Sequence, residues 1–271
     1  MPVGARSNSR AQMRIQRQHE PMAPRLDDSL EARILLEQGG LLAVDKPHDL
    51  PTSGRALDDP DCLQWRLMQR SGGMVWAVHQ LDADTTGVNL FTTERALVEP
   101  LKRAMVEKRY LAVVRGRPAW REVSCAAPLG EVRPGHLGVT PEGRASRTTF
   151  QLRRACAGIE EDAWEVEVLL HTGRTHQVRI HAAALGHPLV GEEWYVEPPC
   201  GLHPRQALHA WRLRLGAPFD SVIEAPLAAD LRRLVEGAGS TAARRTSRKP
   251  AADREAPGSG VSPGAPPPRE A

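Results

Sequence analysis

Cysteines are few and far apart in this sequence. The chain has four of them, Cys62, Cys125, Cys156 and Cys200, and no two form a C-x-x-C pair. Because structural zinc sites and disulfide frameworks use closely spaced cysteines, this scatter argues against both and fits a reducing compartment.

Long apolar runs are missing as well. No stretch approaches the roughly 20 consecutive apolar residues that a membrane-spanning helix needs, so we expect no membrane partner. Residues 1–28 lack an apolar signal core but contain arginines, together with prolines that would spoil an amphipathic helix. We therefore predict a disordered basic arm over 1–28 and a cytoplasmic protein, with organellar import as the alternative.

A strong charge imbalance is also absent. The formal net charge is +3, which is compatible with a nucleic-acid partner but does not require one. Residues 237–271 have almost no large apolar side chain and cannot bury enough surface to offset chain entropy. We predict a disordered tail there and one folded domain over 29–236.

The middle of the chain contains both hydrophobic periods. Alternating or short apolar runs predict strands within 32–47, 88–91, 110–116, 146–154, 163–173 and 208–216. Helical spacing predicts helices within 94–108, where Pro100 should cause a kink or a late start, and within 172–186 and 226–237. Because strands outnumber helices and often follow one another directly, we predict an α+β domain with a mixed, mainly antiparallel sheet and helices packed on it. Residues 128–145 should form an excursion at one edge.

Two aspartates, Asp82 and Asp84, stand inside the apolar stretch VHQLDADTTGVNLF. The pattern D-x-D-x-T-G resembles the start of a calcium-binding EF-hand loop. That loop needs a glutamate at its twelfth position, which here is Thr93, and a preceding helix that residues 78–81 do not predict. We therefore discard calcium and predict no metal site.

The same residues also spell the D-x-D-x-T pattern of aspartyl-phosphate phosphatases. In that chemistry the first aspartate attacks phosphorus, the second protonates the leaving group, and a later acidic cluster holds magnesium. The candidate clusters, 160–162 and 192–193, fall in a turn and a loop, and His79 and Gln80 stand where that family has an apolar strand. This interpretation stays open as an alternative.

Five segments, in order, resemble the RluA-type pseudouridine synthases. HQLDADTTGVNLF is similar to that family's H-R-L-D-x-x-T-S-G-L-L-L-F, and KRYLAVVRG to its K-x-Y-L-A-L-V-x-G. HTGRTHQVRIHAAALGHPLVGEEWY resembles T-G-R-T-H-Q-I-R-V-H-x-A-x-L-G-H-P-I-x-G-D-x-x-Y. LLAVDKPHDLP resembles the family's opening L-x-V-x-N-K-P-x-G-L, and LHAWRLRL with EAPLAADLRRL its closing segment. One short motif matches by chance, whereas five collinear matches over about 34–235 are specific.

The resemblance implies a pseudouridine synthase fold around a central RNA-binding cleft, no cofactor, and conversion of a uridine in ribosomal or transfer RNA to pseudouridine. It places Asp82 in the catalytic position and Arg179 beside it, as the cation that keeps the carboxylate ionised. Tyr110 would stack on the uracil and handle the proton lost from C5. Asp84 falls in a variable position, so we expect it to cap a turn or face solvent.

The resemblance also implies a set of RNA contacts: His79, Gln80, Thr86, Gly87, Lys108, Gly173, Arg174, Thr175 and His176. Arg144 and Arg147 are further candidates for phosphate contacts. His176 and His181 are five residues apart on the predicted helix, a spacing that does not converge on a metal ion, so we expect scaffold hydrogen bonds from them.

The sequence departs from the family pattern at several positions. Asn89 interrupts an apolar strand, Asp45 replaces an asparagine, and Gln80 replaces the arginine that in the family displaces the target base. Since Gln80 carries no charge and stacks poorly, a second hypothesis is an RNA-binding module with weak or no catalysis. Residues before about 28 are too few and too polar for an S4-type RNA-binding module, and we expect a monomer.

Overall fold

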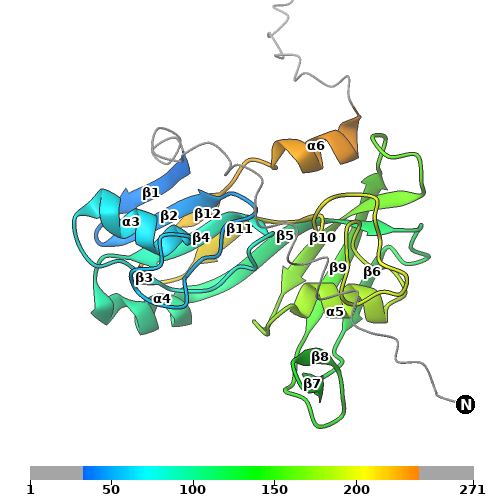
Figure 1. Ribbon diagram of the computed structural model, residues 1–271, viewed down its shortest axis with the longest axis horizontal. Coiled ribbons are helices and arrows are strands. Elements are labelled where there is room, and N and C mark those ends of the chain that lie inside the picture. Colours follow the sequence, from blue (N-terminus) through cyan, green and yellow to red (C-terminus); the bar gives the residue numbers. More distant parts are fainter. Residues whose placement is uncertain (1–32, 238–271) are drawn as a thin grey trace, which may run out of the picture. The chain divides into compact units, whose positions relative to one another are not determined.

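A ten-stranded sheet organises residues 33–237, the part of the chain that the computed structural model describes (Figure 1). Its central path runs β1-β2-β4-β11-β5-β10-β9-β6, with β3 paired to β4 and β12 to β11. The strands are β1 (Ile34–Gln38), β2 (Leu41–Lys46), β3 (Trp76–Ala77), β4 (Thr86–Thr92), β5 (Met105–Arg115), β6 (Glu122–Cys125), β9 (Thr148–Ala155), β10 (Ala163–Leu170), β11 (Leu208–Leu215) and β12 (Val222–Glu224). A separate hairpin joins β7 (Leu129–Arg133) to β8 (His136–Val139).

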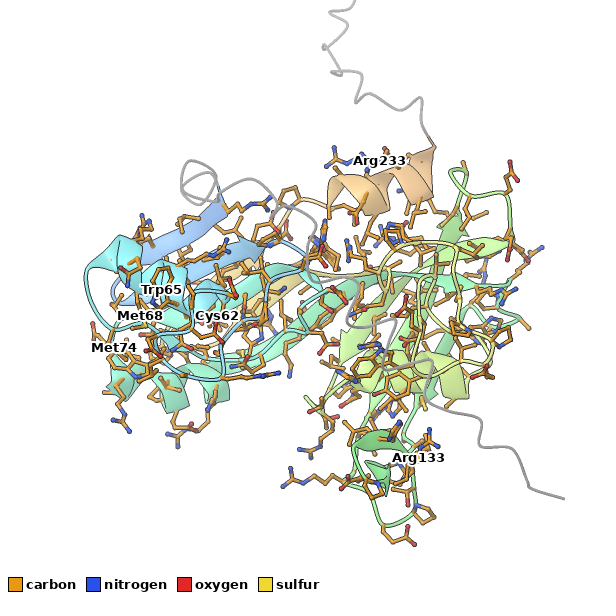
Figure 2. All side chains as sticks on the ribbon, viewed as in Figure 1. Cys62, Trp65, Met68, Met74, Arg133 and Arg233 are labelled. Atoms are coloured by element: carbon orange, nitrogen blue, oxygen red, sulfur yellow. The ribbon has the colours of Figure 1, made fainter. Side chains whose placement is uncertain are left out.

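The pairing in this sheet is antiparallel except between β4 and β11, which run parallel. The predicted α+β class with a mixed, mainly antiparallel sheet is therefore confirmed. The β7–β8 hairpin lies within the predicted excursion, 128–145, and Arg133 marks it in Figure 2.

All seven residues of β4 are buried, including Asn89, whose amide needs partners in the core. Thr52 Oγ1 lies 2.8 Å from Asn89 Oδ1, and Asn89 Nδ2 donates to the carbonyl of His79 at 3.1 Å. These bonds tie β4 to the segment that precedes it. The residue that interrupts the apolar strand thus fixes the start of the 79–85 loop.

Four α-helices pack on the sheet within 33–237. Helix α3 (Leu63–Ser71) contributes Leu63 and Leu67 to a core with β2 and β4, near the Cys62 and Trp65 labels of Figure 2. Helix α4 is Val98–Ala104, α5 is Gln177–Ala184, and α6 is Ala229–Glu236. Helix α5 packs Val178 and Ala182 against the buried face of β5 and β10.

All three helix predictions are wrong at one or both ends. The helix predicted over 94–108 starts late, as predicted from Pro100: a 3-10 turn, Arg95–Leu97, precedes α4, which begins at Val98. Its predicted end is wrong, because Met105 already begins β5. The helix predicted over 172–186 begins only at Gln177, because Gln177 Oε1 accepts hydrogen bonds from Thr172 Oγ1 (2.7 Å) and Arg174 N (3.1 Å) and so holds 172–176 as a turn. The last helix begins at Ala229, three residues after the predicted start.

The predicted arm, 1–28, and the predicted tail beyond Gly237 lie outside the described residues. Within 33–237, no helix has the length and apolarity to cross a membrane.

Candidate active site

The loop that contains Asp82 joins β3 to β4, and a buried lysine forms hydrogen bonds to its backbone. Lys46 Nζ donates to the carbonyls of Ala83 (2.7 Å), Leu50 (2.7 Å) and Pro47 (2.9 Å). These three acceptors use all three N–H groups of an ammonium ion. Burial lowers the pKa of Lys46 to about 7, and the nearby carboxylates of Asp84 and Asp82 oppose that shift. The backbone next to Asp82 is therefore fixed by a fully buried lysine.

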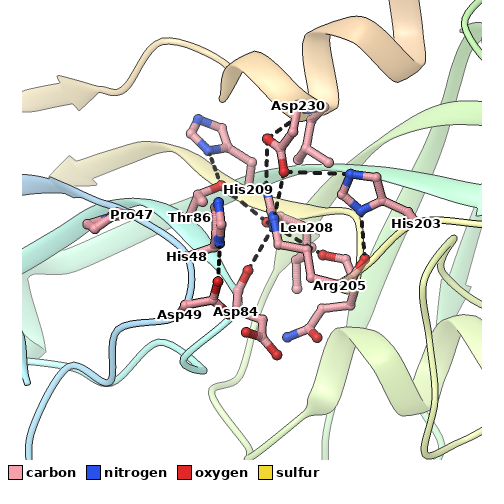
Figure 3. A network of polar contacts seen from close by, with 12 residues as sticks. Pro47, His48, Asp49, Asp84, Thr86, His203, Arg205, Leu208, His209 and Asp230 are labelled. Atoms are coloured by element: carbon pink, nitrogen blue, oxygen red, sulfur yellow. Dashed lines mark hydrogen bonds and ion pairs between the residues drawn. The ribbon is translucent and has the colours of Figure 1, made fainter. Parts of the chain in front are cut away.

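Arg205 holds the following carbonyl of the same loop (Figure 3). Its Nη1 donates to the Asp84 carbonyl at 2.8 Å, while Nε and Nη2 bind the Asp230 carboxylate of α6 at 2.8 and 3.1 Å. The backbone on both sides of the loop's second aspartate is thus anchored to the core. Burial and a hydrogen bond with Asp49 raise the pKa of the Asp84 carboxyl. Asp84 therefore belongs to this supporting network, with its side chain partly exposed.

The Asp82 carboxylate is 26% exposed and faces two cationic or polar groups from the α5 region. Arg179 Nη1 lies 3.6 Å from Asp82 Oδ2, and His176 Nε2 lies 3.8 Å from Asp82 Oδ1. At these distances the contacts are electrostatic, because hydrogen bonds between charged groups are shorter, about 2.7–2.9 Å. The structure therefore brings Asp82 and Arg179 together as the sequence predicts.

The nearest partner of Arg179 is a residue that we did not predict in this role. Its Nε and Nη2 each donate to a carboxylate oxygen of Glu192 at 2.8 Å, and both side chains are buried. The phosphatase alternative gives Glu192 only the role of a magnesium ligand. A signal was present, since a buried guanidinium needs an anion and Glu192 occupies the acidic position of the G-D-x-x-Y motif.

Two aromatic side chains after Glu192 complete the surroundings of Arg179. The guanidinium carbon lies 5.3 Å from the ring centres of both Trp194 and Tyr195. His176 Nδ1 is hydrogen-bonded to the Tyr195 hydroxyl. His176 adopts the left-handed backbone conformation (φ 55°), which turns the chain into α5. The predicted scaffold role of His176 agrees with this contact.

Tyr110 lies on β5, only 7% exposed, in the same cluster as Leu81 and Val178. Burial and the Asp82 charge raise the pKa of its phenol well above the usual value. Lys108, two residues earlier on the strand, has its pKa lowered by burial. Its Nζ would lie 3.4 Å from a Cβ placed on Gly173, so β5 and the turn before α5 approach each other here.

The remaining predicted contact residues divide into two groups. Gln80 is exposed and donates to Ser53 Oγ at 3.0 Å, Thr175 is exposed, and Arg174 donates to the Ala145 carbonyl at 3.3 Å. Three others make their contacts inside the protein. His79 Nε2 accepts from Leu90 N at 3.2 Å, Thr86 Oγ1 lies 2.8 Å from His209 Nδ1, and Gly87 packs against Ala210. Of the predicted phosphate contacts, Arg144 and Arg147 bond through their backbone to Leu129 and Thr172.

The chain matches known proteins over most of the described residues. Residues 40–184 match the family model described as RNA pseudouridylate synthase. The uncharacterized RNA pseudouridine synthase YhcT of Bacillus subtilis is 32% identical, covering 75% of this chain and 71% of that protein. The dual-specificity RNA pseudouridine synthase RluA of Escherichia coli is 31% identical, covering 68% and 87%. Among solved structures, human RNA pseudouridylate synthase domain containing 1 is 27% identical, with a TM-score of 0.62 over 71% of this chain and 82% of that one.

Proposed function

The chain belongs to the RNA pseudouridylate synthase family, and from the geometry of its site we propose that Asp82 is the carboxylate that performs the isomerisation. The enzyme converts uridine in RNA to pseudouridine, so the bond from uracil N1 to the ribose breaks and a bond from C5 forms. No redox step or phosphate transfer is involved. A single carboxylate acting on the nucleotide is sufficient for such a reaction.

The observation that supports this assignment is the convergence of three side chains from separate elements. Asp82 comes from the β3–β4 loop, Arg179 from α5 and Tyr110 from β5, and Arg179 Nη1 is 3.6 Å from the Asp82 carboxylate. Arg179 favours the ionised carboxylate. Burial keeps Tyr110 a neutral phenol, so we assign it to stacking on the uracil and not to removing the C5 proton.

We further propose that the substrate is a structured ribosomal or transfer RNA. A base inside such an RNA must be unstacked before a buried carboxylate can reach it, at a cost of a few kcal/mol. Phosphate contacts from Arg174, Lys108 and other basic side chains would offset this cost and make affinity fall with salt. Target choice would then depend on this domain and the segments flanking it, and we propose a cytoplasmic monomer.

The test is a transcriptome-wide map of pseudouridines in cells with the gene, without it, and with Asp82→Ala. We expect the site or sites lost without the gene to be lost equally with Asp82→Ala, while the variant still binds the RNA. Modification that persists in Asp82→Ala would contradict the assignment.

The second candidate, an RNA-binding module with little catalysis, is favoured only by Gln80. It predicts RNA binding with no pseudouridine that depends on the gene. The D-x-D-x-T residues lie within the matched family segment, 40–184, which favours the synthase over the phosphatase alternative.

A further inference from the structure

Trp194 presents an exposed indole beside the groups that face Asp82. The residue is 63% exposed and is the only aromatic among the large exposed apolar side chains of residues 33–237. A single exposed apolar side chain is ordinary and needs no explanation. The position of this one does, because several contacts fix it at the active site.

The ring is held by the same side chains that approach the catalytic carboxylate. The Arg179 guanidinium carbon lies 5.3 Å from the Trp194 ring centre, and the His176 ring meets the indole edge to face at 5.4 Å. Arg179 and His176 are also the two basic side chains that form ion pairs with Asp82, at 3.6 and 3.8 Å. In addition, Trp194 N donates to Glu192 Oε1 at 2.9 Å. The indole is therefore placed in advance, next to the reaction centre, with much of its surface open.

We propose that Trp194 is a stacking platform for an unpaired RNA base that flanks the target uridine. Single-stranded RNA bases are commonly bound by stacking on aromatic side chains, and every base offers a suitable face. Tyr110 is 7% exposed and lies deep in the site, so it suits the target uracil, whereas Trp194 faces outward and suits a neighbouring base. The inference rests on the proposed function and adds a second base-binding position to it.

The absence of an arginine at position 80 makes such a platform useful. Gln80 stacks poorly and is exposed, with its amide bonded to Ser53. An RNA distorted to expose one uridine also exposes the faces of the bases beside it. Stacking one of these on an indole that is already fixed offsets part of the unstacking cost.

The experiment compares Trp194→Leu with Trp194→Phe, both in the catalytically inert Asp82→Ala protein. Leucine keeps an apolar cover over Arg179 but removes the aromatic face, whereas phenylalanine keeps that face. The probe is a fluorescein-labelled ten-nucleotide oligouridine, and binding is followed by fluorescence anisotropy. We expect the leucine variant to bind about 10-fold more weakly, and the phenylalanine variant within about 3-fold of its parent.

Salt dependence provides an independent reading of the same experiment. Because stacking releases no counterions, the slope of log Kd against log salt should be the same in Trp194→Leu as in its parent. Val222→Ala, at another exposed apolar position (52%), is the control and should bind normally.

Equal binding by the leucine and phenylalanine variants would overturn the platform, as would an oligouridine affinity too weak to measure in the parent or a changed salt slope. These results are distinguishable from failure of the proposed function. That failure would appear as unmodified RNA with the wild-type protein, or as modification that survives Asp82→Ala.

Discussion

Arg179 divides its interactions unequally between two carboxylates. It makes two hydrogen bonds of 2.8 Å to buried Glu192 and only a 3.6 Å ion pair with the partly exposed Asp82. The hydrogen bonds to Glu192 thus offset the cost of burying the guanidinium, and the positive charge of Arg179 also attracts the Asp82 carboxylate. Glu192 acts through Arg179, so it is a positioning residue.

Replacement of Glu192 tests this division. Glu192→Gln leaves a buried guanidinium without its anion, and we expect the free energy of unfolding to fall by about 3 kcal/mol. Urea denaturation measures it, with exposed Glu193→Gln as the matched control. Arg179→Met combined with Glu192→Gln should recover part of the loss, because neither charge is then buried alone. Equal free energies of unfolding for Glu192→Gln and Glu193→Gln would contradict the role of Glu192 as the anion that compensates Arg179.

The sequence predicts the three proposed catalytic side chains, but it does not predict the anion that pairs with Arg179. Asp82, Tyr110 and Arg179 stand in motifs whose order matches a family, and the structure brings them together. The pairing of Arg179 with Glu192 depends on the path of the chain after α5, which brings Glu192 back to the side of that helix. Neither hydrophobic period nor local spacing encodes that return, so only the general need of a buried cation for an anion pointed to it.

At the scale of elements, the site depends on how β4 meets β11. These strands run parallel, with Gly87 opposite Ala210, and Gly87 has a φ of +105°. A Cβ at this position would lie 2.1 Å from the Ala210 carbonyl oxygen. Glycine is therefore required by packing, which a sequence motif alone does not distinguish from a role in binding RNA.

Gly87→Ala should accordingly destabilise the fold. We expect a loss of about 3 kcal/mol or more in the free energy of unfolding, because backbone strain and overlap with β11 add. Gly73→Ala is the control, since a Cβ there would meet no atom within 4 Å. Thermal or urea unfolding measures both. A stable Gly87→Ala protein with weakened RNA binding would instead support the predicted substrate contact.

Two buried basic side chains, Lys46 and Arg205, hold the loop between β3 and β4. Arg205 also pairs with Asp230 and so links this loop to α6. Arg205→Met removes the bond to the Asp84 carbonyl and the pair with Asp230. A displaced loop moves Asp82, and a shift of about 1 Å can lower kcat roughly 100-fold. We expect a fall in kcat larger than any rise in KM, measured below the unfolding temperature. Arg233→Met, at an exposed position of α6 labelled in Figure 2, should leave kcat and KM unchanged. An equal fall in kcat in Arg205→Met and Arg233→Met would contradict the role of Arg205 in holding the loop.

Sequence period predicted the strands well and the helix ends poorly. The alternating segments became β9, β10 and β11 because period-two burial is a local property. Residues 172–176 instead follow the side chain of Gln177, and Met105 joins β5 because Leu215 pairs with it across the sheet. Tertiary contacts decided both ends.

At the scale of the whole molecule, several histidines are kept neutral by burial. His209 is fully buried, and burial lowers its pKa to about 4; the shifts of His79, His181 and His203 have the same direction. The unfolded chain binds these protons below about pH 6.5, whereas the folded protein binds them only at lower pH, about 4 for His79 and His209. The stability from this source is therefore complete above pH 6.5 and is lost as the pH falls toward 4.

Comparison of wild type with His209→Asn isolates this effect. Arg205 and Asp230 also face His209, so the difference between the two proteins is more informative than either curve. Between pH 7.5 and pH 5, we expect wild type to lose up to about 2 kcal/mol more free energy of unfolding than the variant. Exposed His136→Asn should follow wild type. If the free energy of unfolding changed with pH equally in wild type and His209→Asn, the result would contradict the claim that His209 is buried in its neutral form.

The most direct test of the account is release of the C5 hydrogen from RNA. Protein-free RNA labelled with tritium at uridine C5, taken from cells that lack the gene, is incubated with purified wild type, Asp82→Asn and Asp84→Asn. Wild type should release tritium and leave pseudouridine, and Asp82→Asn should release none. Asp84→Asn should retain activity, because the Asp84 side chain is hydrogen-bonded to Asp49 in the supporting network, whereas Asp82 faces Arg179. Release by Asp82→Asn at the wild-type rate would show that the carboxylate beside Arg179 is not the catalytic group.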